Sequence, residues 1–305
     1  MGLLLALQGA ISQGILWGIM ALGVYITFRI LNISDLTVDG SFATGGAVCA
    51  ICITNGVSPI LSILIAIVAG AIAGAITGFL HTKCQIPAIL AGILTQIGLY
   101  SINLRIMGGR SNLPLLQVGT IFKDVANATG ISANIVTLVM GILIAIFIVS
   151  LAYTFFGTEI GSAIRSTGNN EHMSRAQGIN TNATKMIGLM ISNALIALSG
   201  ALVTQSQGYA DVKMGIGAIV IALASIVIGE VIFGKTGGFK KRLSSIIIGS
   251  VLYRIIVALV LQMGLSTDDL KLLTAILVGV ALSVPVMMEK RKQDAMYKKL
   301  TGGLD

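Results

Sequence analysis

Long apolar runs separated by short polar links make up most of this chain of 305 residues. A membrane-spanning helix needs about 20 predominantly apolar residues, and runs of about this kind recur along the whole sequence. The pattern therefore predicts an all-α polytopic integral membrane protein with about nine transmembrane helices, within a range of eight to ten. The predicted spans are 7–28, 38–54, 58–80, 87–107, 132–155, 184–206, 216–233, 244–262 and 270–288, of which the second and seventh are short.

The longest polar run, GTEIGSAIRSTGNNEHMSRAQGINTNATK at 157–185, lies between the fifth and sixth predicted spans. It contains a short predicted helix with a signal at each end. Asn169 or Asn170 can cap the start, because a side-chain oxygen accepts a free first-turn N–H, and Glu171 then lies where the helix dipole favours an anion. Gly178 can end the helix in the left-handed conformation. A short helix held in water between spans suggests a docking element, and a merely solvated loop is the alternative.

The composition excludes a soluble globular domain. Charged residues are 10% of the chain and apolar residues are 55%, whereas soluble domains carry about 25% charged residues. The mean hydropathy is +0.94. The whole chain, 1–305, is thus predicted to form a single transmembrane domain. The net charge of +8 could indicate a nucleic-acid partner, but the distribution of the basic residues argues for orientation in a bilayer instead.

Most of the 20 basic residues fall on one side of the membrane if the N-terminus is outside and the spans alternate. Cytoplasmic segments of membrane proteins are enriched in Lys and Arg, so this arrangement predicts an external N-terminus and a cytoplasmic C-terminus. The polar run 157–185 and the basic tail 289–305 then lie in the cytoplasm, and the largest external loop is 108–131. The predicted localisation is the cytoplasmic membrane, with no nucleic-acid partner.

The first and sixth predicted spans are each followed by a polar link and a short span. The links read LNISDLTVDGSFATGG and QGYADVKMGIGAI, and each has an acid, Asp35 or Asp211, before a glycine-containing helix start. The two pairs would enter the membrane from opposite sides. An inverted repeat with short segments in matching positions is typical of a transport path.

Polar residues inside or beside these spans are candidates for lining such a path. Asp35, Asp39 and Ser41 begin the second span, where capping of the helix is the alternative role. Gln96 and Asn103 lie on one face of the fourth span, and polar groups there should face protein or a water-filled path rather than lipid. Hydrogen bonding between helices is the alternative for this second pair.

Arg254 lies near the middle of the eighth predicted span. An arginine at that depth costs about 2.5–3.5 kcal/mol on insertion scales, so such residues face the bundle interior and have a partner in most cases. We expect Arg254 to face a central path, where it would attract a carboxylate, or to pair inside the bundle with an acid or with free backbone carbonyls.

No catalytic constellation, metal site or cofactor site is predicted. Cys49 and Cys52 have CxxC spacing, but on a membrane helix they read as small packing residues. Residues 229–236 match the phosphate-binding pattern GxxxxGK[ST], which requires a strand followed by a helix N-terminus. The match falls at the C-terminal end of a predicted span, so we do not expect the chain itself to hydrolyse ATP.

Three segments carry a resemblance to a known family. LNISDLTVDGSFATGGAV at 31–48 and the polar run 157–185 resemble the permease subunits of ABC importers, and YRIIVALVLQMGLSTDDLKLLTA at 253–275 is similar to one branch of them. Within these, the chain resembles the branched-chain amino acid and ribose permease superfamily, and most of all the branch associated with tryptophan and tyrosine uptake. The resemblance covers essentially the whole chain, and LTVDGSF is its most specific motif.

The resemblance implies a permease domain that forms a homodimer around a central path. It also implies two cytoplasmic ATP-binding subunits and an extracytoplasmic substrate-binding protein as partners. The family's coupling segment maps onto Arg165–Ile179. The residues expected to couple the permease to the ATPase are Gly168, Asn170, Glu171, Arg175, Ala176, Gly178 and Ile179.

The predicted function is therefore that of the permease subunit of an ATP-binding-cassette importer. By this resemblance it moves a small solute by alternating access, with an amino acid expected and an aromatic one as an option. The alternative is an ion-coupled secondary transporter, which needs no ATPase. Such a transporter usually carries membrane-buried acids for the coupling ion, whereas the acids here cluster at span ends. An intramembrane enzyme is disfavoured by the missing catalytic constellation.

Overall fold

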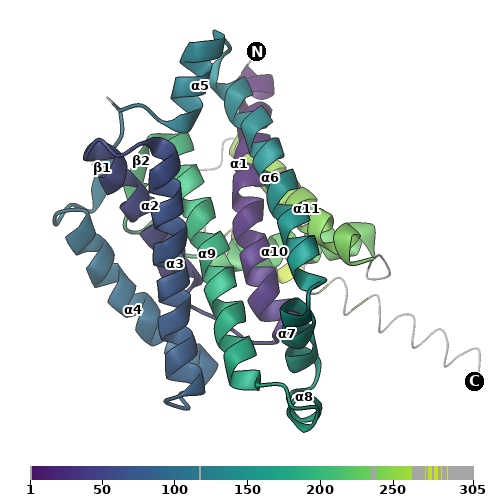
Figure 1. The fold of residues 1–305 in the computed structure, drawn as a ribbon. Coiled ribbons are helices and arrows are strands. Elements are labelled where there is room, and N and C mark those ends of the chain that lie inside the picture. The colour runs from purple at the N-terminus through teal and green to yellow at the C-terminus, as the bar shows by residue number, and fades with distance from the viewer. Residues whose placement is uncertain are drawn as a thin grey trace, which may run out of the picture.

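The computed structural model describes residues 2–262 except 117 and 235–237, together with 272, 274–276, 278–280, 283 and 287. Within these residues the chain is predominantly helical, as the apolar pattern predicts (Figure 1). The ninth predicted span, 270–288, lies largely outside the described residues, and the basic tail, 289–305, lies wholly outside them.

Each of the first eight predicted spans corresponds to a helix. In the described part of the chain six helices have the length and composition of a membrane span, and α2 and α10 are shorter apolar helices, as the two short runs predicted. The helices that match predicted spans are α1 (Gly2–Tyr25), which continues as a π-helical segment η1 (Ile26–Ile30), α2 (Val38–Thr54), α3 (Pro59–Thr82), α4 (Ala88–Ile106), α6 (Ala133–Phe156), α9 (Thr181–Gln207), α10 (Ala218–Phe233) and α11 (Phe239–Gln262).

The loop between α4 and α6 has more regular structure than its sequence predicts. It contains β1 (Asn112–Pro114) and α5 (Ile121–Thr129), which begins at a cap where the Thr120 hydroxyl accepts a hydrogen bond from the Lys123 N–H. β1 pairs antiparallel with β2 (Tyr209–Asp211), which follows α9. This pairing places the C-terminal ends of α4 and α9 at the same end of the bundle, as the predicted alternation of spans requires.

The polar run 157–185 lies at the other end of the bundle. It folds into α7 (Glu159–Asn169) and α8 (Glu171–Ala176) before α9 begins. Figure 1 shows α8 at the bottom of the view, opposite α5 and the start of α1 at the top. The start of α1 and the predicted coupling loop are therefore at opposite ends of the bundle, in agreement with the predicted alternation.

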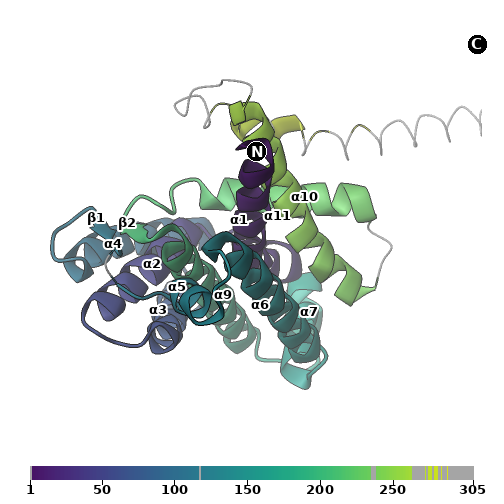
Figure 2. The same ribbon diagram turned by 90° about the horizontal axis from the view of Figure 1, so that it is seen from above.

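Helix α9 packs closely against its neighbours through glycine. Between α2 and α9, a Cβ at Gly45 would lie 2.0 Å from the carbonyl oxygen of Ala197, and between α3 and α9 a Cβ at Gly74 would lie 2.3 Å from that of Leu189. Small residues allow membrane helices to approach this closely. Seen from above, α4 lies at one edge of the molecule, and α11 lies on the other side of α2 and α9 (Figure 2).

Candidate functional site

The link that precedes α2 is fixed by a buried polar network. Asp35 Oδ1 accepts a hydrogen bond from the backbone N–H of Thr37 at 2.8 Å, and its Oδ2 accepts one from Nδ2 of Asn193 at 2.8 Å. Oδ1 of Asn193 in turn accepts a bond of 2.6 Å from the Ser41 hydroxyl. These four residues are at most 2% exposed. The carboxamide on α9 therefore joins the link to the first turns of α2 inside the bundle.

Asp39 connects the starts of two short helices. Its side chain, in the first turn of α2, accepts hydrogen bonds from the backbone N–H groups of Gly217 at 2.9 Å and Ile219 at 3.1 Å, at the start of α10. A Cβ at Gly215 would lie 1.9 Å from the carbonyl oxygen of Asp39, so only glycine allows this approach. The carboxylate thus caps α10 rather than its own helix, and its charge complements the α10 dipole.

The two similar polar links that precede the short spans meet in the structure, because Asp39 contacts Gly217. Short helices whose N-termini meet inside a bundle form substrate or ion sites in many transporters. The correspondence between Asp35 and Asp211 does not extend to their surroundings. Asp211 lies in β2, where it accepts a hydrogen bond of 3.3 Å from Nδ2 of Asn112 in β1.

A pocket of about 310 Å³ opens beside this junction. Three predicted pathway residues line it, Asp39, Gln96 and Asn103, together with Tyr100 of α4. Asn103 is fully buried, and its Oδ1 has no hydrogen-bond partner within the described residues. Its Nδ2 lies 3.5 Å from the carbonyl oxygen of Gly40. The structure therefore brings Asp39 of α2 close to Gln96 and Asn103 of α4. The Oδ1 acceptor of Asn103 has no donor within the described residues.

Arg254 lies apart from this pocket. It is on α11, on the other side of α2 and α9 from α4 (Figure 2), and its guanidinium carbon lies 4.2 Å from the ring centroid of Trp17 on α1. It lines a separate pocket of about 400 Å³ with Gln13 and Gln262. Neither its Nε nor Oε1 of Gln13 has a hydrogen-bond partner among the described residues. The structure does not bring Arg254 together with the other predicted pathway residues.

The predicted helix in the polar run is present as α8. Asn170 caps it, with Oδ1 accepting a hydrogen bond of 3.0 Å from the Met173 N–H, and Gly178 follows it with φ of +84°. These are the two end signals that the sequence predicts. Asn180 caps α9 in the same way, through the N–H of Ala183. Both ends of α8 are therefore defined by local side-chain and backbone chemistry.

Glu171 holds α8 against the start of α9. Its Oε1 accepts hydrogen bonds from Arg175 at 2.7 Å and Thr181 at 3.3 Å, and its Oε2 accepts one from Lys185 at 2.7 Å. The hydrogen bond from Lys185 is the largest cause that lowers the pKa of the Glu171 carboxyl from its ordinary value, because it stabilises the ionised form. Lys185 and Thr181 were not among the predicted coupling residues, since they belong to the next helix.

The other predicted coupling residues take different positions. Gly168, in α7, approaches η1 so closely that a Cβ would lie 1.8 Å from the carbonyl oxygen of Ile30. Ala176 and Gly178 are exposed, and Ile179 is half-buried. The exposed residues of α8 and its C-terminal end, named the α8 face below, are His172, Met173, Arg175, Ala176 and Gln177.

Asn193 is the main site residue that the sequence analysis misses. A buried amide within a span is itself a signal, because such a group must find a polar partner, but its partners are 152 and 158 residues away in sequence. Of the phosphate-binding pattern, Gly229 lies within helix α10 and Gly234 ends it, while 235–236 lie outside the described residues. The described part of this match is helical, so it has no strand preceding a loop.

A bundle of apolar helices with a pocket lined in part by polar residues at the junction of two short helices, and a structured loop at one end, is typical of a multi-span membrane transport protein. The chain belongs to the family described as the permease component of the branched-chain amino acid transport system, whose model matches residues 6–283. The resemblance predicted from the sequence is thereby confirmed.

Individual relatives agree with this assignment. The chain is 42% identical to the tyrosine transport system permease protein of Clostridioides difficile, over 88% of this chain and 87% of the relative. It is 28% identical to the ribose import permease protein RbsC of Haemophilus influenzae, over 77% of this chain and 70% of the relative. Among solved structures, PsaBC from Streptococcus pneumoniae in complex with Fab has a similar fold, with a TM-score of 0.51, 16% identity and 90% of each chain covered.

Proposed function

We propose that this chain is the permease subunit of an ATP-binding-cassette importer that moves an amino acid across the cytoplasmic membrane by alternating access. The observation that carries the proposal is the junction of α2 and α10 at Asp39, beside a pocket that Gln96 and Asn103 also line, in a member of a transport permease family. Packed elements of this kind switch between discrete arrangements. A small displacement at the junction would expose the pocket to one side of the membrane or the other.

In this proposal the solute passes between α4 and the junction. Gln96 and Asn103 offer it hydrogen-bonding groups, and the unpaired Oδ1 of Asn103 suits an amino group. Asp39 already accepts two backbone hydrogen bonds, so it holds the two short helices together rather than binding the solute. Asp35 and Ser41 act through Asn193 as positioning residues. Arg254 lines a second pocket, where its charge would attract the carboxylate of the solute.

An aromatic amino acid is the first candidate for the solute. The relative from Clostridioides difficile, 42% identical, is named as a tyrosine transport system permease protein. Tyr100, on the pocket wall, is 46% exposed. Aromatic rings pair in offset or edge-to-face arrangements that add about 0.5–1.5 kcal/mol beyond the burial of area, so Tyr100 is positioned to favour an aromatic side chain.

The α8 face is the proposed docking surface for a separate ATP-binding subunit, which would carry out the hydrolysis. The support is a short helix with defined ends whose Met173 is 43% exposed and whose Arg175 is also exposed. A helix tied to α9 through Glu171 can pass a displacement on to the spans. We also propose an extracytoplasmic substrate-binding protein at the end that carries α5, and a homodimer around the path.

Reconstitution in liposomes with the ATP-binding subunit and the cognate binding protein, followed by an amino-acid screen, tests the proposal. We expect uptake that requires ATP. Asn103→Leu should lower uptake about tenfold, which corresponds to about 1.4 kcal/mol of lost interaction, with docking of the ATP-binding subunit unchanged. Uptake driven by an ion gradient without the ATP-binding subunit would overturn the proposal in favour of a secondary transporter.

A further inference from the structure

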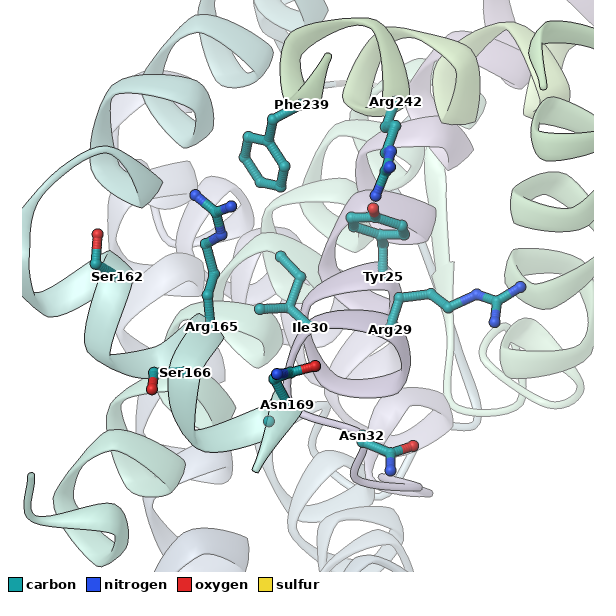
Figure 3. Close-up of a pocket in the computed structure, with 11 residues that line it drawn as sticks. Tyr25, Arg29, Ile30, Asn32, Ser162, Arg165, Ser166, Asn169, Phe239 and Arg242 are labelled. Atoms are coloured by element: carbon teal, nitrogen blue, oxygen red, sulfur yellow. The ribbon is translucent and has the colours of Figure 1, made fainter. Parts of the chain in front are cut away.

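Three arginines from three different elements line one cavity at the end of the bundle that carries α7 and α8. Arg29 comes from η1, Arg165 from α7 and Arg242 from the first turn of α11, and together they line a cavity of about 760 Å³. Figure 3 shows Arg165 and Arg242 approaching it from opposite sides. The other lining residues are Tyr25, Ile30, Asn32, Ser162, Ser166, Gly168, Asn169 and Phe239.

The described residues that line the cavity include three arginines and no acid. Glu230 forms an ion pair with one of these arginines, Arg29. Arg165 packs over the ring of Phe239, with its guanidinium carbon 5.1 Å from the ring centroid. Arg165 and Arg242 are both exposed. Their guanidinium groups can therefore reach a ligand that enters from outside.

The packing of η1 against α7 keeps the cavity in place. Arg29 lies in the π-helical turn that follows α1, and Gly168 lets α7 come against the Ile30 carbonyl. Tyr25 lies beside Arg242, and Figure 3 shows its hydroxyl directed toward that guanidinium. The polar groups therefore come from segments that are packed together, which is the condition for a defined binding site.

Two of the three arginines lie at the ends of candidate membrane spans. Arg29 lies at the last turn of the first membrane-spanning helix, and Arg242 lies in the first turn of α11. Phe28, next to Arg29, is 37% exposed. Basic residues at the ends of spans lie at the surface of the membrane, and basic pockets between transmembrane helices on the cytoplasmic side bind anionic lipid headgroups.

We propose that this cavity binds the phosphate-bearing headgroup of an anionic phospholipid. Arginine's planar fork of donors matches phosphate oxygens in a bidentate way, and the amide of Asn169 adds a neutral donor beside it. The headgroup would bridge α1, α7 and α11. Since α7 leads directly into α8, occupancy would stiffen the connection between the α8 face and the spans.

Native mass spectrometry of the full-length protein tests this proposal. In mixed micelles with equal amounts of phosphatidylglycerol and phosphatidylcholine, we expect the wild-type protein to retain phosphatidylglycerol preferentially. The double variant Arg165→Gln/Arg242→Gln should lower this retention about tenfold. The matched control is Arg105→Gln/Arg110→Gln, which removes two exposed arginines near the other end of the bundle and should leave retention unchanged.

A second measurement separates a lipid from a free anion and does not depend on the double variant's folding. The wild-type protein is placed in phosphatidylcholine nanodiscs and titrated with inorganic phosphate, and its thermal midpoint is compared with that in nanodiscs containing phosphatidylglycerol. We expect stabilisation by phosphatidylglycerol alone. Equal stabilisation by inorganic phosphate would overturn the lipid in favour of a soluble anion. Equal retention of the two lipids by the wild-type protein would overturn the site altogether.

Discussion

The carboxylate of Asp39, at the start of α2, lies against the backbone of Gly217, at the start of α10, with Oδ2 2.9 Å from the amide nitrogen. The two residues are 178 positions apart in the chain. The bond caps the start of one short helix with a side chain from another short helix of the same chain. It ties together the two links that enter the bundle from opposite ends, so the relative position of α2 and α10 depends on one side chain.

Removal of this cap should loosen the junction. We expect Asp39→Ala to lower the free energy of unfolding by about 1–2 kcal/mol, the upper part of the range for losing a helix cap, and to lower uptake in proteoliposomes. Asp39→Asn keeps an acceptor oxygen but not the charge, so its effect should be smaller. Asp124→Ala, in the first turn of α5, is the matched control. If Asp39→Ala were as stable and as active as this control, the junction would not depend on the cap.

Asn193 should be required for stability because it satisfies two buried groups at once. Asn193→Leu leaves Asp35 Oδ2 and the Ser41 hydroxyl without this partner, and each unsatisfied buried group costs about 1–3 kcal/mol. Thermal unfolding in detergent measures the loss. Asn134→Leu, at an exposed position of α6, serves as the control and should change little.

Asn193→Asp gives a more specific test of the same network. It keeps an acceptor for Ser41 but places a second carboxylate beside Asp35. Two carboxylates at one site cannot both ionise without a large penalty, so one of them takes up a proton more readily. The stability of this variant should therefore rise as the pH falls. A variant equally unstable at all pH values would show that the geometry, rather than the charge, is what Asn193 provides.

Local signals in the sequence predicted much of this structure. The ends of α8 follow from Asn170 and Gly178, which act within a few residues of themselves, and α2 occupies the predicted range 38–54. Apolar length alone located eight helices. These features depend on hydrophobic period, capping and turn chemistry, which neighbouring residues determine together.

The remaining features depend on contacts between distant parts of the chain. The sequence left two roles open for Asp39, lining a path or capping its own helix, but its hydrogen-bond donors are at the start of α10. β1 has three residues and is defined only by its pairing with β2, so it is too short for a periodic pattern to predict it. The α4 residues Gln96 and Asn103 were predicted to share a face, yet their proximity to Asp39 depends on how α2 packs against α4. Tertiary packing determines which residues of two neighbouring helices lie side by side.

The cap of α8 can be tested with a pair of asparagine variants. Asn170→Ala removes the side-chain acceptor for the Met173 N–H and should cost about 1 kcal/mol. That loss should be evident as faster hydrogen exchange at 171–177 and weaker binding of the ATP-binding subunit. Asn182→Ala is the control, because this residue is exposed in the first turn of α9 and is not its cap. Equal effects of the two variants would contradict the assignment of the cap.

The Glu171 ion pairs should make the order of the loop depend on pH. Lys185 holds the pKa of the Glu171 carboxyl below its ordinary value, which is about 4.3 for Glu. The contribution to stability is therefore fully present above that value and is lost as the pH falls through the lower pKa of the folded state. Limited proteolysis of 171–185 should be pH-independent near neutrality and should accelerate only in acid.

Glu171→Gln supplies the control for this pH dependence. The amide keeps one acceptor but cannot ionise, so proteolysis of the loop should be faster than in the wild-type protein at neutral pH and should vary less with acidity. The Gln variant should also bind the ATP-binding subunit more weakly than the wild-type protein does at neutral pH. A Gln variant with the wild-type pH profile would show that another group controls the loop.

Arg254 combines a costly position with an unusual partner. Its guanidinium stacks on Trp17, the single tryptophan of the chain, and the ion pairs found among the described residues do not include it. Arg254→Leu should therefore remove a half-buried cation without leaving an acid unpaired, and the variant should insert normally with a thermal midpoint at or above that of the wild-type protein. The fluorescence of Trp17 should change, because the cation over its ring is gone.

Uptake measurements on Arg254 variants test what the cation does. A half-buried arginine that lines an open pocket attracts carboxylates, so we expect Arg254→Leu to give a stable protein with reduced uptake of an amino acid. Arg254→Lys keeps the charge but loses the planar fork, and should retain an intermediate rate. Titration of wild-type Trp17 fluorescence with the transported amino acid should show a saturable change that the Leu variant lacks. A Leu variant that unfolds at lower temperature would instead identify a structural partner, and one with normal uptake, stability and titration would exclude both roles for Arg254.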